Sequence, residues 1–130
     1  MAKFGDFIKT EDFKKEKHVP VIEIPTDIKA NEPFDILVSV GKEIPHPNTT
    51  EHFIQWISLY YKPEGEPFMY SLGKSYFEAH GASTKGANKG PAYVNPSAVF
   101  NVKLEKPGLL IAMESCNIHG IWESSVEIKM

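Results

Sequence analysis

The side chains of this chain that could do metal or thiol chemistry are one cysteine, Cys116, and five histidines. Cys116 and His119 have a C-x-x-H spacing in ESCNIHGIWES, His46 and His52 bracket HPNTTEH, and His18 precedes the apolar run VPVIEI. Taken singly, each is weak evidence, because isolated histidines are commonly surface residues and an isolated cysteine is commonly a small buried hydrophobe. Cys116 therefore has three open interpretations: a nucleophile, a metal ligand or a buried side chain without chemistry.

The segment between the paired histidines predicts how they are presented. Pro47 favours an extended conformation at His46. Asn48 followed by Glu51 has the form of an N-cap and its capping-box partner. The sequence therefore predicts one helical turn here, which would present His52 from a fixed position.

The cysteine segment has a similar local pattern. The backbone amides of Asn117 and Ile118 are predicted to point at the sulfur of Cys116, and Gly120 allows the next strand to leave sharply. His80, in EAHGAS, has no other candidate ligand beside it, so we interpret it as a structural residue and not as a ligand.

Four imidazoles and one thiolate, if gathered at one end of a fold, suit a borderline divalent transition metal such as iron. Structural zinc takes four ligands in a tetrahedron, and blue copper takes two histidines, one cysteine and a weak axial methionine. Four equatorial histidines with an axial thiolate leave one coordination position open for a substrate. A non-catalytic copper protein and a structural interaction module with incidental histidines remain the alternatives.

The elements that must position these residues are short strands. Seven apolar runs rich in Val, Ile, Tyr and Phe, separated by Pro and Gly turns, predict strands at 19–24, 34–40, 53–61, 69–77, 98–104, 109–114 and 122–128. This pattern predicts an all-β fold, a seven-stranded antiparallel immunoglobulin-like β-sandwich. A short N-terminal helical turn is expected within 6–14, and 84–96 is expected to be a long polar loop.

Composition excludes several classes of protein. A chain of 130 residues is expected to be one domain, 1–130, and its net charge of −3 with no arginine argues against nucleic-acid binding. One cysteine excludes an internal disulfide and fits a reducing compartment. No apolar run is long enough to span a membrane, and MAKFGDFIKT lacks the apolar region of a signal peptide, so a cytoplasmic location is expected.

Three stretches, EKHVPVIE, VGKEIPHPNTTEH and CNIHGIWE, together resemble the signatures of superoxide reductases, the neelaredoxin and desulfoferrodoxin family. The resemblance runs over most of the chain and includes AHG at 79–81. The four-cysteine rubredoxin-like module of desulfoferrodoxins is not present, so the chain resembles the one-iron neelaredoxin type. Phe53 and Ser115 depart from relatives that often have histidine and an aromatic residue there.

The resemblance implies one iron (Fe²⁺/Fe³⁺) per chain. By that resemblance the equatorial ligands would be His18, His46, His52 and His119, with Cys116 axial. It also implies catalytic roles for the EK pair on a mobile loop over the open position: Lys17 would attract the anion and organise a proton-donating water, and Glu16 would occupy that position once iron is ferric.

The reaction implied by the resemblance is one-electron reduction of superoxide to hydrogen peroxide, with consumption of two protons. Because the chain has no second redox centre, an external donor such as rubredoxin would be required. A homotetramer is also expected from the family. Weak dismutation is a competing activity, and a cupredoxin-like electron-transfer sandwich is the main alternative of another class.

Overall fold

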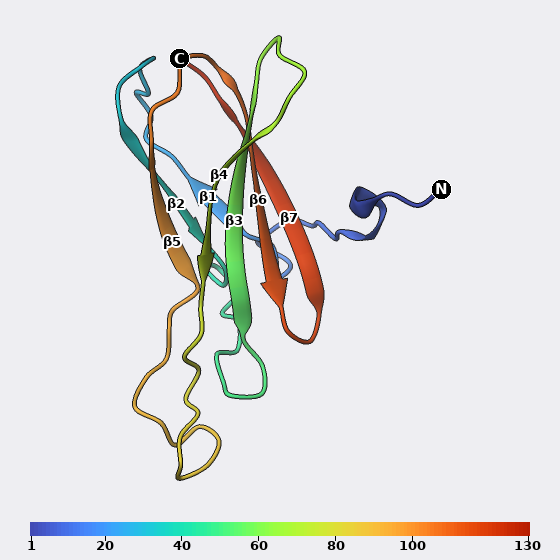
Figure 1. Ribbon diagram of the computed structural model, residues 1–130, viewed down its shortest axis with the longest axis vertical. Helices are drawn as coiled ribbons and strands as arrows, with labels where there is room; N and C mark the ends of the chain where they lie inside the picture. The colour runs from blue at the N-terminus through green and yellow to red at the C-terminus, as the bar shows by residue number, and fades with distance from the viewer.

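The computed structural model describes all 130 residues and forms a sandwich of two antiparallel sheets (Figure 1). The smaller sheet has the order β1-β2-β5 and the larger sheet has the order β4-β3-β6-β7. The elements are the 3₁₀ turn η1 (Phe4–Phe7), β1 (Val21–Glu23), β2 (Phe34–Ser39), β3 (Ile54–Pro63), β4 (Tyr70–Tyr76), β5 (Ser97–Val102), β6 (Gly108–Cys116) and β7 (Gly120–Ile128). The predicted fold class is confirmed, and β4 is hydrogen-bonded to β3 in the larger sheet.

The core lies between the sheets and is made of the alternate, inward-facing residues of each strand. In β2, Ile36 and Val38 are fully buried, whereas their neighbours are partly exposed. In β3, a register shift between Ile54 and Trp56 inserts Gln55 as an extra residue. Ile54 therefore faces the core together with Ile57, and Trp56 faces outward.

All seven predicted strands are present, but β6 is longer than the predicted 109–114. It continues to Cys116, which pairs with Gly120 at the start of β7. Cys116 therefore belongs to a strand end, and the connecting loop is only 117–119. Because both flanking strands are held by the sheet, the thiol and the hairpin turn beside it have a fixed position.

The predicted helical turn within 6–14 is misplaced. The chain makes its 3₁₀ turn earlier, at Phe4–Phe7, and a separate turn in which the amides of Lys15 and Glu16 donate to the carbonyl of Asp12. Between them, Lys9 is bonded to the free edge of β7: its amide donates to the carbonyl of Ile121, and its carbonyl accepts from Glu123. Strand-like pairing requires an extended backbone, so one helix cannot cover this segment.

The predicted long loop at 84–96 is confirmed as a segment without strands, and it extends from one end of the sandwich (Figure 1). It returns to the body through an isolated bridge between His80 and Tyr93. Gly81 has φ = +80°, and a Cβ there would lie 2.4 Å from the Tyr93 ring, so this close approach requires glycine. The structure contains no helix with the length and hydropathy needed to cross a membrane.

Candidate metal centre

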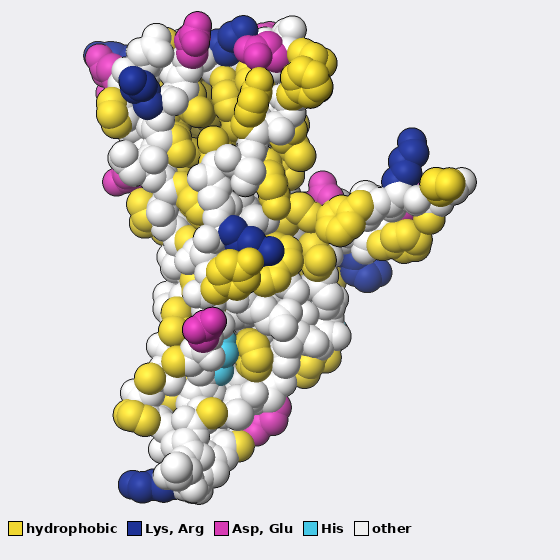
Figure 2. Space-filling model, in the orientation of Figure 1, with side chains coloured by type: hydrophobic (Ala, Val, Ile, Leu, Met, Phe, Trp, Pro, Cys, Tyr) yellow, Lys and Arg dark blue, Asp and Glu magenta, His cyan; other side chains and the backbone are white.

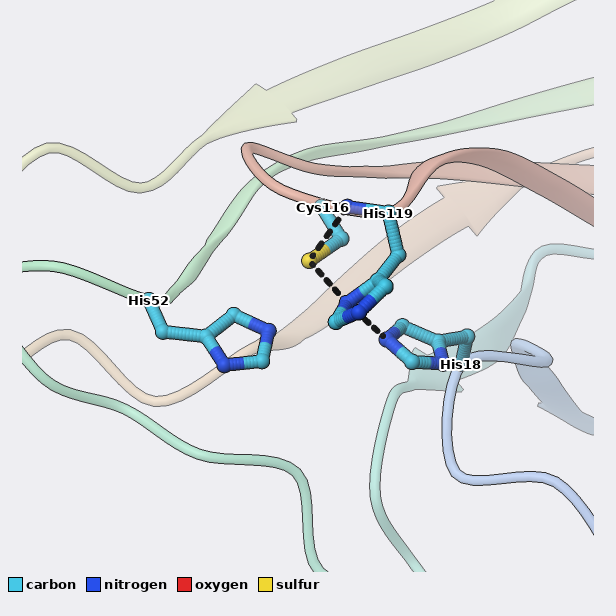
Figure 3. Close-up of side chains that lie close together, drawn as sticks. All are labelled: His18, His52, Cys116 and His119. Carbon is cyan, nitrogen blue, oxygen red and sulfur yellow. Dashed lines mark hydrogen bonds between the residues drawn. The ribbon is translucent and has the colours of Figure 1, made fainter.

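The predicted ligands meet at one end of the sandwich, although three separate parts of the chain supply them. His18 precedes β1, His46 and His52 lie in the loop between β2 and β3, Cys116 ends β6, and His119 lies in the β6–β7 hairpin. Figure 3 shows His18, His52, Cys116 and His119 pointing toward one common volume. Their ligand atoms all lie within 4.8 Å of one another.

The four imidazole rings form a nearly square ring. Centroid distances along its sides are 4.8 Å between His18 and His46, 4.7 Å between His46 and His52, and 5.1 Å between His52 and His119. The fourth side, from His119 back to His18, is 4.7 Å, and the His18–His52 diagonal is longer, at 6.4 Å. His46 and His119 therefore occupy opposite corners, as do His18 and His52.

Hydrogen bonds on the outside of this square determine which nitrogen atoms face its centre. Nδ1 of His46 is bonded to the carbonyl of Pro47 at 2.7 Å, and Nδ1 of His18 is bonded to a carboxylate oxygen of Glu16 at 2.7 Å. Both partners are acceptors, so the ring proton lies on Nδ1 and the lone pair lies on Nε2. For His18, Nε2 lies 3.1 Å from Nδ1 of His119.

Buried nitrogen atoms without partners test whether a metal fits here. Nε2 of His46 and Nε2 of His52 are buried and have no hydrogen-bond partner. Such groups are costly to bury unless something binds them. Nε2 of His52 belongs to the cluster that contains the thiol, and the ring of His46 lies beside it, with its centroid 4.7 Å from that of His52. A metal ion would satisfy these unpartnered lone pairs, and the donor set fits one iron per chain.

The protonation states agree with ligation, which requires neutral imidazoles. Burial lowers the pKa of His18 and His52, and it lowers the pKa of His46 to about 4. The positive charge of Lys17 acts in the same direction on all three. These side chains are therefore neutral at pH 7.

The thiol of Cys116 is buried beside the square of imidazoles. Its sulfur accepts a hydrogen bond from the backbone amide of His119 at 3.4 Å and lies 3.8 Å from Nδ1 of that residue. The prediction that the backbone amides of Asn117 and Ile118 point at the sulfur of Cys116 is wrong. The Asn117 amide donates to the carbonyl of Phe53, because the hairpin is also tied to the end of the β2–β3 loop.

The predicted helical turn between His46 and His52 is also wrong. Thr49 makes the turn: its hydroxyl accepts from the amide of His52, and its amide donates to the carbonyl of His52. Asn48 and Glu51, the predicted capping pair, bond to the 78–96 segment instead. Tertiary contacts therefore replace the local cap.

His80 lies outside the imidazole square but holds the loop that carries His46 and His52. Its Nδ1 is 2.7 Å from Oδ1 of Asn48, its Nε2 is 2.7 Å from the carbonyl of Phe77, and its ring stacks on Phe53 at 4.0 Å. Both ring nitrogens are thus occupied, which agrees with a structural residue. Phe53 contacts this support and not the centre.

Glu16 and Lys17 lie on the segment before β1, next to the ligand candidate His18. The Glu16 carboxylate accepts hydrogen bonds from the ring and the amide of His18, so it lies on the outer side of that ring. Burial opposes its ionisation, but these hydrogen bonds outweigh burial and hold the pKa of Glu16 below its ordinary value. Lys17 is partly buried, and its positive charge contributes to the lowered pKa of His18, His46 and His52.

Two residues near the centre were missed by sequence reasoning. Trp122 stacks on His18, with centroids 5.1 Å apart and an angle of 15° between the rings, and its indole N–H donates to the carbonyl of His119. In the sequence, the only indication of Trp122 was its position in the segment HGIWE, close to His119. Glu114 is completely buried, neither of its carboxyl oxygens has a partner, and burial raises its pKa to about 9. Glu114 lies among the buried, mostly apolar residues of β6, so the sequence pattern did not single it out.

The chain is similar to a known protein family and to several known proteins. Residues 10–125 match the family model described as Desulfoferrodoxin. The chain is 50% identical to neelaredoxin of Megalodesulfovibrio gigas over 128 residues, which is 98% of each chain. It is also 50% identical to superoxide reductase of Pyrococcus furiosus over 125 residues, covering 96% of this chain and 98% of that one. A Thermotoga maritima crystal structure at 55% identity superposes with a TM-score of 0.96, covering 99% of this chain and 98% of the other.

Proposed function

Because the chain belongs to the desulfoferrodoxin family, we propose that it is a superoxide reductase that converts superoxide to hydrogen peroxide at one non-haem iron. The observation that carries the proposal is the square of four imidazoles with a buried thiol beside it. His18, His46, His52, His119 and Cys116 are the residues that would hold the iron. The proposal treats 1–130 as one iron-binding domain.

Bound iron would supply the single electron that reduces superoxide, which then takes up two protons to become hydrogen peroxide. Cys116 and its hydrogen-bond donor would control how strongly the thiolate donates electrons. A hydrogen bond from the His119 amide to the sulfur withdraws charge from it. The short hairpin that contains both residues keeps this bond in place.

Lys17 is the proposed anion-attracting residue. Neutral imidazoles and one thiolate leave a net positive charge on a divalent site, and the Lys17 ammonium adds to it. A local positive field raises the encounter rate of a small anion even on a protein whose net charge is −3. The same ammonium is proposed to orient a water molecule that donates a proton to the product.

Glu16 is proposed to help release the product, as the resemblance implies. The structure adds a condition to this role. The carboxylate is held by two hydrogen bonds from His18, so it can reach the centre only after they break. While they persist, Glu16 fixes the orientation of the His18 ring.

An external one-electron donor of the rubredoxin type is the proposed partner, since the chain has no second redox centre. His119 is exposed and Ile118 beside it is 57% exposed, which makes the β6–β7 hairpin the proposed contact for that donor. A homotetramer in the cytoplasm remains our prediction. The single free thiol fits a reducing compartment.

Metal analysis and product stoichiometry test the proposal. The purified protein should hold about one iron per chain, and the reduced protein should form one hydrogen peroxide for each superoxide without releasing dioxygen. Dismutation would give half as much peroxide together with dioxygen. Cys116→Ser is the matched variant: it should remain folded and lose the sulfur-to-iron absorption band. Bound copper, or a surviving band, would overturn the assignment.

A copper protein of cupredoxin type is not favoured by the structure. Such a site would need a weak axial methionine near the thiolate. Met113, the methionine nearest to Cys116 in the sequence, pairs with Ser58 and faces outward from the larger sheet, whereas Cys116 faces inward. The four imidazoles also exceed what blue copper uses.

A further inference from the structure

His80 is a buried imidazole whose two nitrogen atoms both face oxygen atoms. The side chain belongs to a residue that is only 5% exposed. Its Nδ1 lies 2.7 Å from Oδ1 of Asn48, and its Nε2 lies 2.7 Å from the backbone carbonyl of Phe77. A neutral imidazole has one N–H donor and one lone pair, so it can donate to only one of these oxygens. The other nitrogen of a neutral ring would direct its lone pair at an oxygen that has no proton to give.

The orientation of the Asn48 amide is fixed by a contact that does not involve His80. Its Nδ2 donates to the backbone carbonyl of Val94 at 3.0 Å. Turning the amide over would offer His80 a donor, but it would also place Oδ1 against the carbonyl of Val94. The oxygen of Asn48 therefore faces His80, and both partners of the ring are acceptors.

The lengths of these contacts and the aromatic ring beside them suit a cation. N–H···O bonds between neutral groups are commonly about 2.9–3.0 Å long, whereas those of charged donors are about 2.7–2.9 Å long. Both contacts of His80 lie at the short end of these ranges. Phe53 stacks on the ring with centroids 4.0 Å apart and an angle of 12°, and the face of an aromatic ring attracts a cation. Burial opposes the charge, but two hydrogen bonds to the charged form favour it.

No carboxylate forms an ion pair with His80. The titratable side chains on the segments packed against it, other than the proposed ligands, are all exposed: Glu51, Glu78, Lys85, Lys89 and Tyr93. Glu51 accepts from Asn88 instead, and Figure 2 shows basic side-chain atoms at the free end of the long loop, away from the body of the protein. His46 and His52, on the same loop as Asn48, are neutral. The two carbonyl-type oxygens are therefore the groups that hold the second proton.

We propose that His80 is an imidazolium ion at neutral pH and that its second proton holds the loop carrying His46 and His52 in place. Asn48 lies between these two histidines, so the bond from His80 fixes the middle of their loop, while the bond to Phe77 anchors the ring to the segment after β4. His80 is thus a positioning residue that acts through Asn48. When rising pH removes the second proton, one buried oxygen loses its donor and the loop is held less firmly. The link to iron rests on the proposed function, whereas the charge on His80 does not.

Nitrogen NMR of the ring tests the charge directly and requires no substitution. The full-length, iron-free protein is labelled with ¹⁵N-histidine, and the His80 ring is assigned by its contact with Phe53. At pH 7, both ring nitrogens of His80 should have the chemical shift of a protonated nitrogen. His18, His46 and His52 are the internal comparison, because burial lowers their pKa and each should have one bare nitrogen. A bare nitrogen on His80 at pH 7 would overturn the proposal.

Hydrogen exchange at a series of pH values tests the hold on the loop. After correction for the intrinsic effect of pH, protection of the amides in 46–52 should fall by about tenfold as the ring loses its second proton, since one buried hydrogen bond is lost. His80→Gln keeps a donor but has no such proton, so this fall should be absent. Asn88→Ala is the matched control: it removes contacts to Thr50 and Glu51 in the same loop but leaves His80 intact, so the fall should persist. An equal fall in His80→Gln, or none in the native protein once the ring has lost the proton, would contradict the proposal.

A third measurement separates this proposal from the proposed function. The NMR and exchange experiments use protein without iron, so a protein that bound no iron would contradict the proposed function alone. In the iron-loaded protein, transfer of ferrous iron to a coloured chelator should accelerate by about tenfold over the same rise in pH, and it should not do so in His80→Gln. Equal acceleration in both proteins would show that the second proton of His80 does not act on the ligands.

Discussion

At the scale of single residues, the chemistry of the centre depends on what each ligand contacts on its far side. Glu16 and Trp122 both act on His18, one through the ring nitrogen and the other through the ring face. Pro47 determines the tautomer of His46 through its carbonyl. Outer contacts of this kind orient metal ligands and adjust their basicity.

Replacing Lys17 tests electrostatic attraction of the substrate. Lys17→Ile should slow the bimolecular reaction of the reduced protein with superoxide by about tenfold or more, and it should weaken the dependence on ionic strength. Rapid-mixing or pulse-radiolysis kinetics at several salt concentrations measure both effects. Lys15→Ile, which removes an exposed lysine nearby, is the control. Equal rates for native protein and Lys17→Ile would remove Lys17 from the mechanism.

Replacing Trp122 tests whether it supports two ligands at once. Trp122→Leu removes the ring stacked on His18 and the hydrogen bond to His119, and we expect iron release to accelerate by about 10-fold to 100-fold. Trp122→Phe keeps an aromatic ring and should show a smaller effect. Transfer of ferrous iron to a coloured chelator gives the rate. If the two variants release iron as slowly as the native protein, the indole has no positioning role.

Replacing Glu114 tests the cost of burying its carboxyl group. Because neither oxygen has a partner, Glu114→Leu should raise the free energy of unfolding by about 1–3 kcal/mol. Urea unfolding of the iron-free protein at pH 7 measures this change. Glu127→Leu, at an exposed position on β7, should have little effect. Lower stability of Glu114→Leu would show that the carboxyl group is bound in solution.

At the scale of elements, the loop between β2 and β3 supplies half of the imidazole square but has no regular structure. Its shape comes from Thr49 within the loop and from the 78–96 segment that packs on it. Asn88 adds two contacts, accepting from the amide of Thr50 and donating to Glu51. The long loop therefore positions ligands although it provides none.

Replacing His80 tests this support. His80→Leu leaves the carbonyl of Phe77 and the side chain of Asn48 without their partner, and it should cost about 1–3 kcal/mol of stability. Amide hydrogen exchange in 46–52 should accelerate, whereas exchange in β2 and β5 should not. Asn101→Ala, which removes an exposed bond to Asp35 on the smaller sheet, is the control. Unchanged exchange in 46–52 would mean that the loop holds its shape alone.

At the scale of the whole molecule, the centre is located where three chain segments converge, whereas the folding core lies between the sheets. The buried apolar cluster has 15 residues, and of the proposed ligands it contains only Cys116. The fold therefore does not depend on metal for its core. Iron would link the segment before β1 to the β2–β3 loop and the β6–β7 hairpin.

Removal of iron tests this separation. The iron-free protein should retain its β-sheet circular dichroism and unfold cooperatively, but at a lower temperature than the iron-loaded protein. A ligand present at a hundred times its dissociation constant stabilises the folded state by about 2.7 kcal/mol. Thermal unfolding with and without a chelator, followed by reloading, provides the comparison. Loss of cooperative unfolding in the iron-free protein would show that the metal is part of the core.

The sequence alone determined the type of fold and the set of candidate ligands. Strand periodicity and turn residues are local properties, so all seven strands were predictable, with errors mainly at their ends. The identities of the histidines and of Cys116 can be read directly, and their combined pattern indicated iron. In the structure, four of the histidines form the imidazole square, and Cys116 lies beside it.

Only the tertiary structure decided how these residues are held. The capping pair Asn48 and Glu51 predicted a helical turn, but contacts with a loop about 40 residues away prevailed. The helical turn near the N-terminus lies earlier than predicted because Lys9 pairs with β7. The roles of His80, Trp122 and Glu16 depend on contacts between segments distant in sequence or on side-chain direction, and neither appears in a local pattern. Local preferences are worth about 1 kcal/mol or less per residue, so a few long-range hydrogen bonds can override them.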